Sequence, residues 1–474
     1  MRFPHVINDN TKEAYAPSSL AVNLKAEEGR KVISENLKWG DDYIPSLSTL
    51  CIKIVSKYFK KIPAIDKLYG ADRDQLLEIL STSLPLQLVV PLIHNEIYWK
   101  RKYKDEFGIL MQRKYFGWTW KQMYLQRYTK KMCEEADPQS QQEDSFSILT
   151  KIFCPYVKKL LLTQLQMWKP PLNLLPEEIP EYWSLDHINF IPILKKLTEI
   201  EEFSIVMGMD NVKDKFVWNM FKFTVLDCSR IGSAVLSLPH IKILRFHRCK
   251  MEDDHCQALI QRLLLNKTLT ELDLSHCAIQ DHGTKCIAKL MTVHPRLEIL
   301  KLNDNKIGSK GTEAIGWALL EPTCCPIVRL DLRTNPLNHA GAMGILRALV
   351  RGTGLKELSL GSCRIDNETV LRIAQMLSLN STIEILDLSN NWCGEDGGEL
   401  LIHCLTTNRS IKWLDLRATN ITEAQHTLIR RILKRNQLNL DEIPDEEIDE
   451  VEEDIIEFDD VEEETEEEEE AEDD

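Results

Sequence analysis

Residues that could do chemistry fall into few groups in this sequence, and the recurring catalytic signatures are missing. There is no GxxxxGK[ST] phosphate-binding loop, no HExxH zinc motif and no GxSxG nucleophile motif. The thirteen cysteines include no paired CxxC with histidines at zinc-finger spacing. We therefore expect no enzymatic activity, no cofactor and no metal site.

The adjacent pair Cys324 and Cys325 is the most conspicuous redox candidate. An odd number of scattered cysteines suits a reducing compartment better than a disulfide framework. We interpret the pair as two small apolar residues that pack behind a repeat. The N-terminus lacks the layout of a secretory signal, and no apolar run approaches the roughly 20 residues that span a bilayer. We expect a soluble, intracellular protein with no membrane partner.

A second candidate is the stretch 91–133, where ten Lys/Arg stand against three Asp/Glu. The interleaved aromatics are Trp99, Tyr103, Tyr115, Phe116, Trp118, Trp120, Tyr124 and Tyr128. Basic residues among aromatics can indicate nucleic-acid binding. The favoured interpretation is structural: the aromatics form the core of a helical head and the lysines coat its surface. A basic face would suit an acidic protein surface equally well, and we expect no nucleic acid.

The third group is an Asn, Cys or Thr that recurs along the C-terminal half. Seven segments fit LxxLxLxx(N/C)xL: LPHIKILRFHRCKM, TLTELDLSHCAI, RLEILKLNDNKI, PIVRLDLRTNPL, GLKELSLGSCRI, TIEILDLSNNWC and SIKWLDLRATNI. Their Asn/Cys positions are Cys249, Cys277, Asn305, Asn335, Cys363, Asn391 and Thr419, spaced by 28, 28, 30, 28, 28 and 28 residues. So regular a period indicates a repeat array.

Each copy predicts the elements that hold these residues. The LxL triplet is a short strand whose two leucines enter the core, and the Asn/Cys bonds to backbone groups of its own and the neighbouring coil. A helix with apolar residues three and four apart follows every copy. Together these features resemble the ribonuclease-inhibitor class of leucine-rich repeat. The expected fold is an α/β solenoid with a parallel sheet inside and helices outside.

The outward residues of each strand would line the inner face of this solenoid. The candidate partner-binding residues are Arg245, His247, Arg248, Asp273, His276, Lys301, Asn303, Asp304, Asp331, Arg333, Asp387, Asn390, Asp415 and Arg417. A polar face of mixed charge suits a protein partner joined by hydrogen bonds and ion pairs. The alternative is a solvated inner face, with binding by the convex side or the head.

Domain organisation follows from the same patterns. We expect a flexible N-terminus at 1–40, an all-helical head at 41–165, a linker at 166–195, repeats at 196–437 and a tail at 438–474. About eight repeats are predicted, the first atypical at Ile200, Phe203 and Ile205. Its insertion, 206–223, carries Phe216, Trp218, Phe221 and Phe223. We interpret this insertion as a cap on the open end of the solenoid; the alternative is a partner-docking loop.

The charge is divided unevenly. Residues 441–474 hold 24 acidic side chains and no basic one, which leaves 58 basic against 50 acidic in residues 1–440. So acidic a block repels itself and is expected to stay disordered. The opposite charges of tail and body suggest that the tail competes with acidic partners for the basic surface of the body.

The head segments are specific enough to suggest a family. WGDDYIPSLSTLCIKIVSKYFKKIP, LPLQLVVPLIHNEIYWKR, WKQMYLQRY and FVWNMFKFTVLDCSRIGSAV precede the repeats. In this order they resemble the dynein regulatory complex subunit 5 family, also called t-complex-associated testis-expressed protein 1, over about residues 35–435.

The resemblance implies a non-enzymatic scaffold subunit of the nexin link in motile cilia and flagella, which regulates axonemal dynein and sperm motility. Implied partners are other subunits of that complex and doublet-microtubule-associated proteins, with this chain as a monomer in the hetero-complex. The long acidic tail and short N-terminal extension depart from the family. They leave open whether this chain is a direct counterpart or a divergent relative.

Two other classes remain as alternatives. LPLQLVVPLIHNEIYWKR followed by WKQMYLQRY is also similar to an F-box, which with leucine-rich repeats would make a substrate receptor of a cullin ubiquitin ligase. The repeats and acidic tail are also similar to the Ran GTPase-activating protein. That family begins its repeats near the N-terminus, whereas about 195 residues precede them here.

Overall fold

The computed structural model describes residues 46–63, 65–108, 117–136, 143–166, 186–207 and 222–442. The chain divides into two compact units, Met1–Ser81 and Thr82–Asp474. Several expectations lie outside the described residues: the flexible segment 1–40, most of the linker, the insertion between 208 and 221, and the acidic tail from 443 onward. Within the described part of the chain, no helix is both long and apolar enough to cross a membrane.

The described residues of the first unit, from 46 onward, form two helices and a short 3-10 turn. Helix α3 (Leu47–Tyr58) begins after Ser46, whose hydroxyl accepts a hydrogen bond from the Thr49 N–H at 3.2 Å. Such an N-cap satisfies one of the amide groups that a helix start leaves free. The other elements are η1 (Ile65–Lys67) and α4 (Gly70–Ile79).

The second unit opens with a helical part whose core is aromatic. Its helices are α5 (Leu86–Leu92), α6 (Glu96–Phe107), α7 (Trp120–Glu135) and α8 (Glu143–Phe153), followed by η2 (Cys154–Tyr156). Trp99 and Tyr124 are fully buried, with ring centroids 5.3 Å apart. Tyr103 and Trp120 are buried as well, so these four aromatics of the basic stretch pack as a core, while Tyr115 and Phe116 lie outside the described residues.

Two lysines of this part differ from the expectation that lysines coat the surface. Lys102 and Lys121 are buried, and their Nζ atoms donate to the carbonyl oxygens of Thr82 and Val90, each at 2.5 Å. Each ammonium group thus satisfies a carbonyl inside the helical part, where burial lowers the pKa of Lys102.

In the described part of the chain a parallel sheet of nine strands follows, in sequence order from β1 to β9. The strands are β1 (Lys159–Leu162), β2 (Glu202–Val206), β3 (Ile243–His247), β4 (Glu271–Asp273), β5 (Ile299–Lys301), β6 (Arg329–Asp331), β7 (Glu357–Ser359), β8 (Ile385–Asp387) and β9 (Trp413–Asp415). The first leucine of each LxL triplet pairs in register with the next, as Leu272 does with Leu300 and Leu300 with Leu330. Leu272, Leu300 and Leu330 are fully buried.

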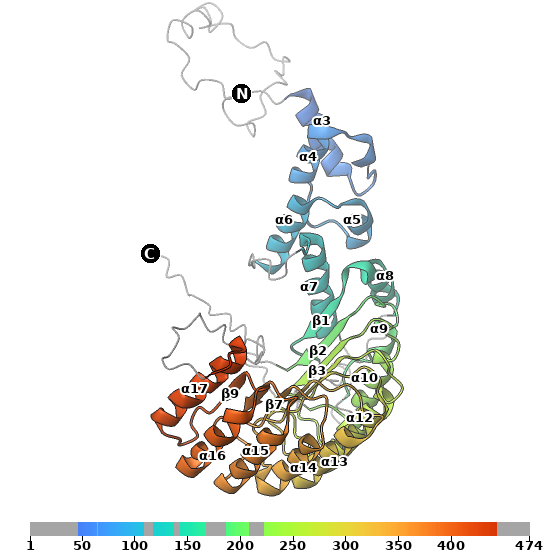
Figure 1. Cartoon of the computed structure of the whole chain (residues 1–474). Helices are drawn as coiled ribbons and strands as arrows, with labels where there is room; N and C mark the ends of the chain where they lie inside the picture. The colour runs from blue at the N-terminus through green and yellow to red at the C-terminus, as the bar shows by residue number, and fades with distance from the viewer. Residues whose placement is uncertain are drawn as a thin grey trace, which may run out of the picture. The chain divides into compact units, whose positions relative to one another are not determined.

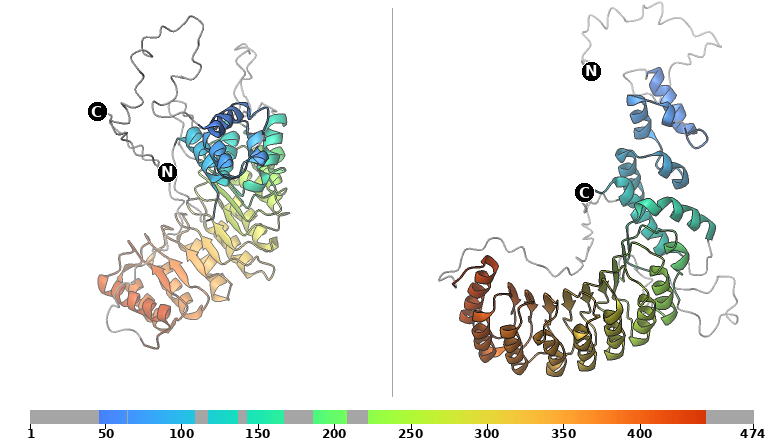
Figure 2. Two further views of the ribbon diagram at one scale, coloured as in Figure 1. Left: turned by 90° about the horizontal axis from the view of Figure 1, so that it is seen from above. Right: turned by 45° about the vertical axis from the view of Figure 1, so that its right-hand side comes forward.

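Helices cover the outer side of this sheet, as Figures 1 and 2 show. They are α9 (Ile191–Leu194), α10 (Val225–Val235), α11 (Asp253–Leu263), α12 (Asp281–Val293), α13 (Ser309–Leu320), α14 (Asn338–Val350), α15 (Asn367–Leu379), α16 (Gly394–Thr407) and α17 (Glu423–Leu438). Helices α13 and α14 approach so closely that a Cβ on Gly316 would lie 2.1 Å from the Gly344 carbonyl oxygen. The predicted α/β leucine-rich-repeat solenoid is confirmed.

The start of the sheet corrects the sequence interpretation. Residues 147–165 were expected to be helical, but α8 ends at Phe153 and β1 lies inside the predicted head. Leu160 and Leu162 are buried, like the two outer leucines of the later LxL triplets, while Leu161 between them is 43% exposed. Because β1 pairs with β2, the sheet has one strand more than the eight repeats expected from sequence.

Only the end of the predicted cap is described. Phe223 is buried, and its ring centroid lies 5.3 Å from that of His187 and 6.1 Å from that of Phe246 in β3. The other three aromatics of the insertion lie outside the described residues.

Candidate protein-binding face

The recurring residues at the Asn/Cys position of the repeats, which we call the ladder residues, fix the chain where each strand ends. The Asn335 Nδ2 group donates to the carbonyl oxygens of Leu302 in the preceding coil and Leu332 in its own coil, at 2.9 and 3.0 Å. Its Oδ1 accepts from the Ile307 N–H at 3.0 Å. Asn305 and Asn391 make the same set of bonds. One buried amide thus ties two coils together.

Thiols and a hydroxyl take this place in the other coils. Cys363 Sγ donates to the Leu332 carbonyl at 3.2 Å, and Cys249 and Cys277 bond to carbonyls in the same manner. Burial raises the pKa of Cys277 and of Cys363 to about 12, so both thiols keep the proton that they donate. Thr419 Oγ1 donates to the Leu416 carbonyl at 2.5 Å.

Side chains of the inner face form rows that run across the strands. The middle row contains Arg245, Asp273, Lys301, Asp331, Ser359, Asp387 and Asp415, each paired in register with the next. The residues two positions further on are His247, Ser275, Asn303, Arg333, Gly361, Ser389 and Arg417. Arg248, His276, Asp304 and Asn390 lie in the turns beyond, each with a positive φ between 50° and 57°. The structure therefore places all fourteen candidate residues along the inner face and its strand-exit edge.

The four aspartates of the middle row are less accessible than a partner contact requires. Asp273, Asp331, Asp387 and Asp415 are only 1–5% exposed. Each accepts a hydrogen bond from the backbone N–H two residues on, at 2.8 to 3.1 Å. Their carboxylates fix the backbone where the strand ends, and they are not exposed to solvent.

Two of these aspartates orient an arginine through the same tripeptide, Asp-Leu-Arg. Arg333 contacts both carboxylate oxygens of Asp331, with Nη2 at 2.9 Å from Oδ2. Arg417 does the same to Asp415 at 2.6 Å, although the Arg417 side chain is 83% exposed. A planar guanidinium held on one edge keeps its remaining N–H groups in a fixed direction, which suits recognition of carboxylates.

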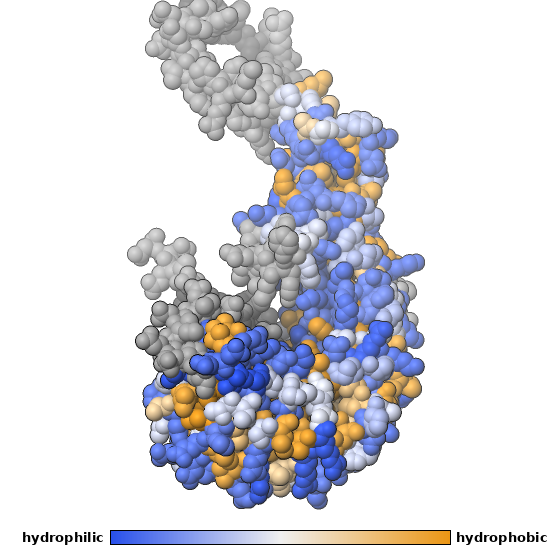
Figure 3. Space-filling view, viewed as in Figure 1, coloured by the Kyte–Doolittle hydropathy of each residue, from blue (hydrophilic) through white to orange (hydrophobic). Residues whose placement is uncertain are grey.

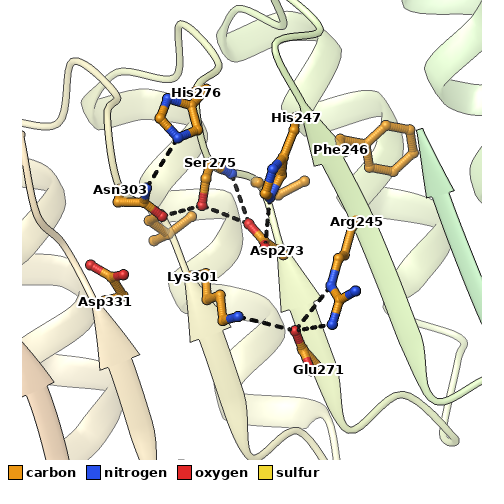
Figure 4. A network of polar contacts seen from close by, with 12 residues as sticks. Arg245, Phe246, His247, Glu271, Asp273, Ser275, His276, Lys301, Asn303 and Asp331 are labelled. Atoms are coloured by element: carbon orange, nitrogen blue, oxygen red, sulfur yellow. Dashed lines mark hydrogen bonds and ion pairs between the residues drawn. The ribbon is translucent and has the colours of Figure 1, made fainter. Parts of the chain in front are cut away.

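The N-terminal half of the face carries an ion-pair network across the strands (Figure 4). Arg245 bonds to Glu202 in β2 at 2.7 Å and to Glu271 in β4 at 3.1 Å. Lys301 in β5 lies 3.6 Å from the same Glu271 carboxylate. Glu202 and Glu271 were missed by the sequence reasoning, although they stand two positions before a middle-row residue and so face the same side.

A histidine, an aspartate and a serine meet beside this network, as they do in some hydrolases. His247 Nε2 lies 2.7 Å from Asp273 Oδ2, and Ser275 Oγ donates to Asp273 Oδ1 at 2.6 Å. Nucleophilic catalysis requires the hydroxyl to donate to the imidazole. Here the hydroxyl bonds to the carboxylate and contacts Asn303 (Figure 4), so the arrangement is a polar network rather than an activated serine.

The pKa values of Asp273 and Asp387 are shifted in opposite directions. Burial alone would raise the pKa of Asp273, but hydrogen bonds from His247 and Ser275 hold it below its usual value. Burial raises the pKa of Asp387, and the nearby carboxylate of Asp415 adds to the rise. Asp387 has a serine two residues on, where Asp331 and Asp415 have an arginine, so no guanidinium from its own strand neutralises it.

The outer helices and the cysteine pair differ in character from the inner face. The view in Figure 3 shows a largely hydrophilic surface over the outer helices, with apolar side chains in scattered groups. Cys324 and Cys325 are free thiols, and Cys325 is buried with its N–H donating to the Met291 carbonyl. No cluster of three or more His, Cys, Asp or Glu with metal-binding geometry occurs among the described residues.

Comparisons with known proteins agree with this fold. A family model described as "Leucine Rich repeat" matches residues 265–288 and 294–316. Mouse dynein regulatory complex subunit 5 is 30% identical over 269 residues, which are 55% of this chain and 54% of the relative. The human protein of that name is 28% identical over 273 residues, with the same two shares. Mouse ribonuclease inhibitor is 27% identical over 235 residues, 43% of this chain and 52% of the inhibitor.

The predicted resemblance to dynein regulatory complex subunit 5 is thus confirmed. The chain spans about half the length of these curated relatives.

Proposed function

We propose that this leucine-rich-repeat protein is a non-enzymatic scaffold subunit of the nexin-dynein regulatory complex of motile cilia and flagella. The observation that carries the proposal is the similarity to dynein regulatory complex subunit 5 of three mammals, at 28% to 30% identity. In this role the chain binds other subunits and doublet-microtubule-associated proteins, and it contributes to the regulation of axonemal dynein and of ciliary and sperm motility. Its place is the cytoskeleton of the axoneme.

The inner face supports a binding role of this kind. Its strands are joined by backbone pairing and by the buried ladder, so its exposed groups keep fixed positions. Arg333 and Arg417 are each held along one edge by an aspartate, and arginine is enriched among residues that dominate protein interfaces. A rigid face with oriented guanidinium groups fits an acidic surface of a neighbouring subunit.

The test is to express a tagged full-length chain in a ciliated cell and isolate its axonemes. We expect the tag along the axoneme, and co-extraction with dynein regulatory complex subunits at the salt concentration that releases them. Arg417→Glu together with Arg333→Glu should reduce this incorporation. Lys310→Glu with Lys285→Glu, which change the same charge on α13 and α12, is the matched control.

Other results would assign other functions. Co-purification with a cullin adaptor, without axonemal signal, would favour the F-box receptor. Accelerated GTP hydrolysis by Ran would favour the GTPase-activating protein. Either result contradicts the axonemal scaffold.

A further inference from the structure

The strand-exit edge of the solenoid carries a surface that the proposed function leaves unused. Directly after the ladder residue, four coils present an exposed basic or aromatic side chain at the same position: Lys250, Lys306, Arg364 and Trp392. We call these four residues the basic rim. Among the described residues, none of its three cations forms an ion pair. Trp392 is 62% exposed, which is unusual for so large an apolar side chain.

A pocket of about 390 Å³ lies at the Trp392 end of the rim. It is lined by Arg364, Ile365, Asp366, Asn390, Asn391, Trp392 and Ala418. The Asp366 carboxylate is already used, because it caps α15 by accepting from the Thr369 N–H at 2.9 Å. The uncompensated charge at this pocket is therefore the Arg364 guanidinium. An indole beside a free guanidinium suits an apolar side chain flanked by carboxylates.

The chain itself contains a segment of that chemistry. Residues 451–461 read VEEDIIEFDDV, in which Ile455, Ile456 and Phe458 stand among acidic residues. Phe458 is the one aromatic residue of the sequence after 441, and no basic residue occurs there. Both the apolar and the acidic parts of the segment thus match what the rim and its pocket offer.

The length of chain after α17 is sufficient for this contact. Helix α17 starts near the strand exits and has 16 residues, so it carries the chain about 24 Å toward the opposite edge. From Glu442 to Ile455 the extended chain spans at most about 45 Å. This length is sufficient for the chain to run from the end of α17 back to the strand-exit edge. It also covers the distance from the last coil to Trp392 in the preceding coil.

We propose that residues 451–461 dock on the basic rim of the same chain. Ile455, Ile456 and Phe458 occupy the pocket beside Trp392, and the flanking carboxylates pair with Arg364 and Lys306. The contact is intramolecular and is held partly by charge, so an acidic segment of a partner can displace it.

The test uses full-length protein and a fluorescent synthetic peptide of residues 447–464, with binding measured by anisotropy. A tail variant with Ile455→Ser, Ile456→Ser and Phe458→Ser keeps the charge of the tail but removes its apolar anchors. A tethered segment reaches an effective concentration near the millimolar range, so we expect the peptide to bind this variant about tenfold more tightly than it binds the unaltered protein. Raising the salt concentration should weaken binding.

Rim substitutions in the tail-variant background complete the test. Arg364→Glu and Trp392→Ala should each weaken peptide binding about tenfold, equivalent to about 1.4 kcal/mol. The charge-matched control Lys310→Glu on α13 should leave binding unchanged. Equal affinity for the unaltered protein and the tail variant would overturn the proposal; if that binding still required Trp392 and Arg364, it would assign the rim to a partner segment instead. Equal loss in Lys310→Glu would also overturn it, because binding would then be non-specific attraction.

Discussion

Single buried amides set much of the geometry of the inner face. Asn335 is 1% exposed, and it satisfies two carbonyls and one amide group of two neighbouring coils. In the equivalent place Cys363 supplies only a donor. The difference lets one ladder position be tested with two substitutions.

We predict that Asn335→Ala lowers the free energy of unfolding by about 2 to 4 kcal/mol, because buried backbone groups lose their partners. Asn335→Cys should cost less, since a thiol can still donate to the carbonyls. Chemical denaturation measures both. Equal losses in the two variants would show that the thiol replaces none of the hydrogen bonds of the amide.

For Asp387 we expect a substitution to raise the stability of the protein, whereas the Asn335 substitutions lower it. Its pKa is raised by burial and by Asp415, so the charged carboxylate destabilises the folded state at neutral pH. Asp387→Asn should therefore raise the Tm at pH 7. The gain should vanish as the pH falls through the raised pKa and toward the ordinary value of Asp, where the native carboxyl becomes protonated too.

The control for this comparison is an aspartate whose pKa is shifted in the opposite direction. Asp273 has a lowered pKa, so Asp273→Asn should lower the Tm at pH 7, and that loss should shrink on acidification. Thermal melts from pH 3 to pH 8 decide the question. An Asp387→Asn variant less stable than the native protein at pH 7 would contradict the assignment.

At the scale of elements, strand β1 decides where the solenoid begins. Leu160 and Leu162 are buried and continue the leucine rows of the later coils, whereas Leu161 between them is 43% exposed. Helix α7 also packs against β1. The helical part is thus joined to the sheet through β1.

We predict that Leu160→Asp destabilises the end of the sheet by about 3 kcal/mol or more, because it buries an unpaired charge. Leu161→Asp, one residue away in the same strand, should leave stability nearly unchanged. Hydrogen exchange of β2 and α7 measures the effect. Similar exchange in the two variants would contradict the register of β1.

At the scale of the whole molecule, the repeats behave as a chain of nearest-neighbour contacts. Leu302 and Leu332 are fully buried, and the interfaces between coils repeat the leucine rows, in six cases together with a ladder bond to the preceding coil. Solenoids of this kind propagate order from coil to coil, so a break in the middle divides the array.

We predict that Leu302→Asp or Leu332→Asp unfolds the solenoid cooperatively, with faster hydrogen exchange on both sides of the altered coil. Leu160→Asp should instead leave the C-terminal coils from β7 to β9 protected. Hydrogen exchange followed by mass spectrometry resolves the two patterns. Retained thermal stability in either central variant would refute the register of the repeats.

The sequence by itself determined the repeats. Leucines that recur at a fixed period are all buried together when the repeats stack as a parallel sheet backed by helices. It also placed the ladder residues and the inner-face row, since strand alternation follows directly from the LxL triplet. The first helix was predictable from Ser46 and the spacing of its apolar residues.

Tertiary structure alone decided which of these residues are accessible and what they pair with. Asp331 and Arg417 were equivalent in sequence as outward polar residues, yet one is 2% exposed and the other projects into solvent. Strand β1 was hidden because a single LxL triplet without a following repeat resembles a helical apolar run. Burial and the ion pairs of Arg245 and Lys301 with Glu271 depend on neighbouring coils about 28 residues away, and no local pattern contains that information.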